Sequence, residues 1–232
     1  MTNEPEDLRK WRLPRGRHGL PRELVTRSQR ERLLAAVVRA TAAKGYGATT
    51  VADILDEAGV GRETFYELFD DKRTCALTAH ALLTDDLEEK VRAAYMEPGE
   101  WPERMRRALA RALEWFAADP PAAKFMLVEL AGMGTESRVR FQAEFSRFVA
   151  LLDEGLPDAP AAPDVSQATS LGVGAVLARV YEEIVLGRAA SLPELLPDLT
   201  FELLVPFEGE EVARVERGRA VASGSQARSE DR

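Results

Sequence analysis

The sequence predicts an all-α protein of about nine helices, and three observations support this fold class. Apolar residues recur every three or four positions along most of the 232-residue chain, as they do on the buried face of an amphipathic helix. No segment alternates apolar and polar residues in the manner of a half-buried strand. Short clusters of Gly and Pro, such as Pro120-Pro121 and the stretch from Gly155 to Pro163, separate the periodic segments.

Each helix is expected between two such breaks. Thr50 and Asp53 have the spacing of a capping box, which predicts that a two-turn helix starts there and ends at Gly59. Gly45 is expected to end the helix before it, and Asp70-Asp71-Lys72 to open a long one. Besides the helix between Thr50 and Gly59, the expected helices cover about 27–44, 62–68, 72–95, 101–118, 121–132, 135–154, 164–187 and 192–206.

The charge is distributed unevenly along the chain, whose net charge is -8. Residues 9–32 contain nine Lys and Arg against two Glu, a local charge of +7, whereas residues 33–232 carry -12 and residues 1–8 carry -3. A basic segment ahead of an acidic body suits a localised phosphate-binding surface. Charge alone leaves open the alternative of a solvated basic leader without that role.

The segment around residues 50–69 predicts a helix-turn-helix. Two short helices flank the Gly-containing break at residues 58–61, and the preceding helix can buttress them. In the second short helix, Phe65, Leu68 and Phe69 share one side, so its other side is free to enter a DNA major groove, which admits one helix. That free side carries Arg62, Glu63, Thr64, Tyr66 and Glu67.

In order and spacing, three stretches resemble the DNA-binding domain of the tetracycline-repressor (TetR) family: residues 49–54, 58–66 and 69–72. The resemblance covers about residues 27–75. It implies a symmetric homodimer on a palindromic operator in double-stranded DNA, a variable C-terminal body that binds an unknown small-molecule effector, and repression that the effector relieves. An activator on the same scaffold stays open, as does an all-α ligand carrier or enzyme whose helix-turn-helix is only structural.

The resemblance also implies roles for single residues. Arg62 and Thr64 would address base edges, while Thr50, Tyr66 and Lys72 would contact phosphates, Thr50 also capping its helix. Lys72 opposes the dipole of the helix that it begins, a penalty that a docked phosphate would remove, although a solvated lysine is the alternative. Glu63 is a further candidate for base contact, with solvent exposure as the alternative.

Two features depart from the family pattern, and a third extends it. Gly61 stands where a capping Ser or Thr is usual. Glu63 and Glu67 repel DNA unless they accept hydrogen bonds from cytosine amino groups or pair with a nearby basic side chain such as Arg62. By analogy with homeodomain arms, the N-terminal arm with Arg15 and Arg17 would enter the neighbouring minor groove.

The chain is thus expected to comprise a flexible basic arm (1–25), the helix-turn-helix domain (26–72), a helical effector-binding and dimerisation domain (73–207) and a disordered polar tail (208–232). The candidates for lining a pocket for a largely apolar effector are Trp101, Met105, Trp115, Phe125, Met126 and Phe145. The candidates for the homodimer interface are Leu171, Gly172, Ala175, Tyr181, Leu196, Leu199 and Leu203. Burial inside a single body is the alternative for both sets.

Other functions find little support in the residues. No Ser/His/Asp, Cys/His or phosphate-loop pattern is present, so no catalytic residue, cofactor or metal site is expected. Cys75 and His80 are expected to be ordinary buried residues. No apolar run is long enough to span a bilayer, and the polar N-terminus lacks a signal-peptide pattern, so we expect a cytoplasmic protein without a membrane partner.

Overall fold

A computed structural model describes residues 21–153 and 165–230, and within these ranges the chain is helical without any strand. The expected all-α fold is confirmed. Its elements are α2 (Arg22–Lys44), α3 (Val51–Ala58), α4 (Arg62–Leu68), α5 (Lys72–Met96), α6 (Trp101–Ala118), α7 (Pro120–Leu127), the 3-10 turn η1 (Glu129–Met133), α8 (Thr135–Asp153), α9 (Val165–Val185), the 3-10 turn η2 (Ala189–Leu195) and α10 (Leu196–Glu230).

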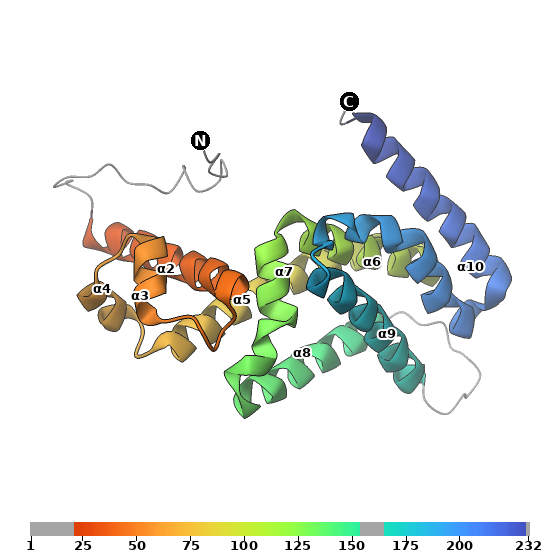
Figure 1. Ribbon diagram of the computed structural model, residues 1–232. Helices are drawn as coiled ribbons and strands as arrows, with labels where there is room; N and C mark the ends of the chain where they lie inside the picture. Colours follow the sequence, from red (N-terminus) through yellow and green to blue (C-terminus); the bar gives the residue numbers. More distant parts are fainter. Residues whose placement is uncertain (1–20, 154–164, 231–232) are drawn as a thin grey trace.

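Helices α2, α3 and α4 gather at one end of the molecule, and α5 connects them to the larger helical body (Figure 1). The apolar positions that the sequence singled out hold this end together, because Val37, Ile54 and Phe65 are all fully buried. Gly59 ends α3 in the left-handed conformation (φ 61), which a residue without Cβ adopts without strain. This geometry lets α4 follow α3 after a very short turn.

The body packs around its own apolar core, in which Leu113, Phe125 and Leu192 are completely buried. The Tyr95 hydroxyl in this core donates to the carbonyl of Leu152 over 2.7 Å. Helix α7 lies between the two parts of the molecule, packing on α2 as well as on α5 and α6. The body and the helix-turn-helix are therefore in direct contact.

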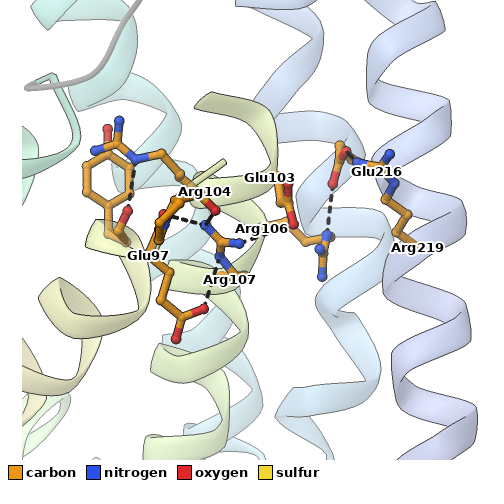
Figure 2. A network of polar contacts seen from close by, with 9 residues as sticks. Glu97, Glu103, Arg104, Arg106, Arg107, Glu216 and Arg219 are labelled. Carbon is orange, nitrogen blue, oxygen red and sulfur yellow. Dashed lines mark hydrogen bonds and ion pairs between the residues drawn. The ribbon is translucent and has the colours of Figure 1, made fainter. Parts of the chain in front are cut away.

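The prediction of a disordered tail from residue 208 is wrong, because α10 continues to Glu230 across a bend at Gly209 (φ 77). The prediction failed because the segment is largely polar and its buried face is narrow. Small and polar residues form this face at helical spacing: Ala213, Glu216 and Ala220. Glu216 accepts from Arg106 of α6 over 2.8 Å, with both side chains largely buried (Figure 2). This ion pair and the small residues beside it hold the last helix against the body.

Three helix boundaries also differ from expectation. The helix expected over about 121–132 is α7, which ends at Leu127, followed by the 3-10 turn η1. Helix α2 begins at Arg22 rather than at about residue 27, because Pro21 supplies a backbone conformation (φ -52) that can precede a helix directly. The helix expected over about 192–206 is the 3-10 turn η2 followed by the first part of α10. The arm residues Arg15 and Arg17 and the Gly155–Pro163 linker lie outside the described residues.

Candidate DNA-binding surface and effector cavity

Helix α3 starts with the capping box that the sequence predicted. The amide of Asp53 donates to Thr50 Oγ1 over 3.2 Å, and the amide of Thr50 donates to Asp53 Oδ2 over 2.8 Å. Asp53 also accepts from Lys44 Nζ, and this bond followed by those from Thr50 holds the pKa of the Asp53 carboxyl below its ordinary value. The start of α3 is thus fixed by side chains, with Thr50 exposed at the surface.

Helix α4 is short and buries only its inner side. Phe65 is fully buried and its ring packs 5.9 Å from that of Phe69, while Gly61 gives the helix no side-chain cap, as expected. The outer side presents Arg62, Glu63, Tyr66 and Glu67 to solvent, with Thr64 half-buried. Arg62 lies 5.6 Å from the centre of the Tyr66 ring, so the guanidinium and the phenol form one exposed unit.

Lys72 has intramolecular partners that the sequence did not indicate. Its Nζ donates to the carbonyls of Tyr46 and Thr49 over 2.7 and 2.6 Å and lies 4.1 Å from the centre of the Tyr46 ring. Partial burial lowers the pKa of the Lys72 ammonium. The lysine therefore ties the start of α5 to the loop before α3, and its contact with a phosphate stays a prediction.

Two side-chain contacts join the helix-turn-helix to α7 and η1, and a third joins the start of α5 to α8. Lys124 of α7 donates to the carbonyl of Ala42 over 2.7 Å, near the end of α2. Glu129 accepts from the amide of Tyr46 over 2.8 Å, and Arg73 of α5 donates to Glu136 of α8. The partners are 63 to 83 residues apart in the sequence, and no local pattern could have identified them.

A largely apolar cavity lies inside the body, with about 970 Å³ of space between its lining side chains, its open mouth included. Helices α5 to α10 all contribute to its wall. Of the predicted pocket residues, Met105, Met126 and Phe145 line the cavity. Four phenylalanines contribute to the lining: Phe116, Phe141, Phe145 and Phe148.

The other three predicted pocket residues do not line the cavity, because each has a different partner. The Trp101 indole donates to the carbonyl of Leu152 over 3.3 Å and its ring packs on Phe207. The Trp115 indole donates to Asp86 over 2.6 Å. Phe125 is completely buried in the core beside His80, with 6.4 Å between the ring centres. Aromatic character alone did not distinguish core from cavity.

The cavity wall also contains a small polar group that was not predicted as a site. His80 and Thr84 of α5 and Glu144 of α8 line the cavity and are all buried. His80 Nδ1 lies 3.4 Å from Thr84 Oγ1 and 3.6 Å from Glu144 Oε1. His80 was expected to be a core histidine, and its position is indeed buried, but helical periodicity gave no sign that Glu144 faces inward.

The predicted interface residues divide into two groups. Leu171 is 70% exposed and Tyr181 is 47% exposed, and Ala175 lies on the same open face of α9. Leu196, Leu199 and Leu203 are buried inside the body, and a side chain on Gly172 would meet Leu203 at 2.7 Å. For the three leucines the interface prediction is wrong, because α9 and α10 pack on each other within one chain, whereas the half-exposed Gly172 stays a candidate.

One other prediction, the burial of Cys75, is confirmed. Cys75 is completely buried, and burial raises the pKa of its thiol to about 12. Among the described residues, no three His, Cys, Asp or Glu side chains come together in a way that could hold a metal ion. Over the same part of the chain, no helix combines the length and hydropathy needed to cross a bilayer.

The described residues form a helix-turn-helix with an exposed second helix, attached to a larger helical body, which is an arrangement that DNA-binding proteins use to present one helix to the major groove. Residues 33–79 match the profile of the family described as "Bacterial regulatory proteins, tetR family", which confirms the TetR resemblance of the DNA-binding segment. No curated protein matches the chain.

Solved structures of tetR-type regulators share the fold. The fatty acid degradation regulator FadR from Bacillus halodurans is 21% identical with a TM-score of 0.70, over 78% of this chain and 96% of that one. FadR from Bacillus subtilis, solved in complex with stearoyl-CoA, is 18% identical with a TM-score of 0.67, over 77% and 98%. A TetR family regulator from Marinobacter aquaeolei VT8 is 18% identical with a TM-score of 0.60, over 85% and 96%.

Proposed function

We propose that this protein is a homodimeric repressor that binds a palindromic operator through α4 and leaves it when a small, largely apolar effector occupies the cavity. The observation that carries this proposal concerns α7. Met126 and Leu127 of this helix line the cavity, while Lys124 of the same helix donates to the end of α2. A change in the cavity can thus reach the DNA-binding end through one rigid element.

The exposed side of α4 supports operator recognition. Arg62 and Tyr66 stand together at the surface, where the guanidinium can donate to a guanine edge and the phenol to a phosphate. Thr64 stays a candidate for base contact, and Glu63 for accepting from cytosine. Thr50 at the start of α3 and Lys72 at the start of α5 are candidates for phosphate contacts on either side of α4.

The open face of α9 supports the homodimer. Leu171, Ala175, Ala178, Tyr181 and Val185 recur at helical spacing and are exposed, which forms a mainly apolar stripe along a helix at the surface. The exposed ion pair between Arg179 and Glu182 interrupts this stripe. A second copy related by a two-fold axis would cover the stripe with its own. To read successive major-groove half-sites, the dimer would have to hold its two copies of α4 about 34–36 Å apart.

The lining of the cavity supports an apolar effector. Apart from His80, Thr84 and Glu144, the wall consists of aliphatic, aromatic and Met side chains. The Bacillus subtilis protein of the same fold was solved with stearoyl-CoA, a ligand with a long apolar chain. The position of the operator within its promoter would decide whether the protein represses transcription or, as the alternative, activates it.

The test is a selection of bound duplexes from genomic DNA, followed by titration of the best duplex by fluorescence anisotropy. We expect the double variant Arg62→Ala, Tyr66→Ala to fold normally and to lose about tenfold to a hundredfold in affinity for that duplex. Arg111→Ala, which removes an exposed arginine from α6, is the matched control and should bind as the parent does. Equal binding of selected and random duplexes by the parent protein would refute the proposal.

A further inference from the structure

A buried carboxylate in an apolar cavity requires an explanation. Glu144 is 7% exposed and lies in a wall that is otherwise formed by apolar side chains, His80 and Thr84. A carboxylate that loses water must be compensated by hydrogen bonds or by an opposite charge, because its desolvation is costly. Apolar side chains of similar size would fill the same place without that cost.

The neighbours of Glu144 within the cavity wall leave its compensation incomplete. Its Oε1 lies 3.6 Å from His80 Nδ1, which is beyond hydrogen-bonding distance. Nδ1 is also 3.4 Å from Thr84 Oγ1, so the single N–H that this nitrogen can carry faces two oxygens. Since the carboxylate has two oxygens and about four acceptor sites, it retains capacity for a donor from inside the cavity.

We propose that the effector carries a hydroxyl or an amine on an apolar skeleton and donates a hydrogen bond from it to Glu144. This inference rests on the proposed function, because it concerns the ligand of the same cavity. The apolar wall would hold the skeleton, and Glu144, with His80 beside it, would select the donor group. A bond to a charged acceptor in a water-poor site is stronger than a bond between neutral groups.

The same chemistry disfavours two other kinds of ligand group at this point in the cavity. An ionised carboxylic acid would bring a second negative charge next to Glu144, which is repulsive in a site of low dielectric constant. An ether, ester or thioester offers only acceptor atoms to the carboxylate and leaves it without a donor. Glu144 therefore acts by selection among apolar molecules rather than by adding affinity for all of them.

The test compares four probes with the same eight-carbon chain: octanol, octylamine, octyl methyl ether and octanoic acid. Their dissociation constants for the full-length protein are measured by calorimetry at neutral pH, below the concentrations at which the probes aggregate. We expect octanol and octylamine to bind at least about tenfold more tightly than the ether, the amount that one hydrogen bond to a charged group provides. Octanoic acid should bind no better than the ether.

Three variants assign the preference to Glu144. Glu144→Leu removes the acceptor and should bind all four probes within about threefold of one another. Glu144→Gln keeps an acceptor oxygen without the charge, so it should retain the preference for octanol and lose most of that for octylamine. Glu89→Gln removes an exposed carboxylate from α5 and should behave as the parent does.

Two results would overturn the inference: equal binding of octanol and its methyl ether by the parent protein, or an unchanged preference in both Glu144 variants. Thermal unfolding of each variant shows whether the fold is kept, and Glu144→Gln provides the answer if Glu144→Leu does not fold. The operator titration is a separate measurement. A protein that binds its duplex specifically but ignores the donor group would contradict this inference and leave DNA recognition standing.

Discussion

Two polar residues of the DNA-binding end differ in how far the sequence could predict them. The capping box of Thr50 and Asp53 was predictable because its partners are three residues apart and the pattern is local. The role of Lys72 was not, since it donates to carbonyls 23 and 26 residues away that come close only when α2, α3 and α5 have packed. The same limit hid Glu144, which lies on α8 while His80 lies on α5.

Asp53 should make the stability of the DNA-binding end depend on pH. Its pKa is lowered in the folded protein, so its contribution is present above the ordinary value of 3.8 and is lost as the pH falls through the lower folded pKa. Asp53→Asn should therefore unfold at a lower urea concentration than the parent at pH 7, and the difference should narrow below the ordinary aspartate pKa. A difference in stability between the two proteins that stays constant as the pH falls below the ordinary aspartate pKa would contradict this account.

A variant of Lys72 can distinguish a structural role of this lysine from a contact with DNA phosphate. Lys72→Met removes two hydrogen bonds from a charged donor, and we expect the free energy of unfolding to fall by about 2 kcal/mol. Lys90→Met, on the exposed side of the same helix, is the control and should change the stability little. If Lys72→Met kept its stability and lost only duplex affinity, the lysine would serve the phosphate alone.

At the scale of elements, helical periodicity predicted the positions of most helices but not which faces meet. Leu196, Leu199 and Leu203 have the spacing of an apolar face, and that spacing fits a dimer interface as well as an internal one. Packing of α9 on α10 within the chain decides between them. The helix after Gly209 was not predicted because it lacks a recognisable apolar face: its buried side consists of two alanines and a paired glutamate rather than large apolar residues.

The junction between α7, η1 and α2 should be visible in amide exchange. The amide of Tyr46 donates to Glu129, so Glu129→Gln should weaken this bond and raise the exchange rate of that amide about tenfold. Glu136→Gln, which removes a carboxylate from the exposed contact with Arg73, is the control and should leave Tyr46 protected. Equal protection of Tyr46 in all three proteins would mean that the junction does not hold the loop.

At the scale of the whole molecule, the sequence predicted the fold class and the position of the helix-turn-helix. The proposal of a homodimer depends instead on the exposed stripe along α9. Ala178→Arg would place a long charged side chain in the middle of that stripe. We expect the variant to sediment as a monomer at micromolar concentration and to lose operator affinity. Ala93→Arg, at an exposed position of α5, should leave both properties unchanged. A parent protein that is already monomeric would exclude the arrangement.

The ion pair between Arg106 and Glu216 has a consequence for proteolysis. Helix α6 contributes Met105 and Leu109 to the cavity wall, and Arg106 of the same helix holds the last helix. A molecule bound in the cavity that stabilises α6 should therefore also slow proteolytic cleavage of the chain beyond Gly209. Removal of that segment should in turn weaken binding of the molecule, because the same coupling free energy links the two effects. The far end of the chain then becomes a reporter of what the cavity contains.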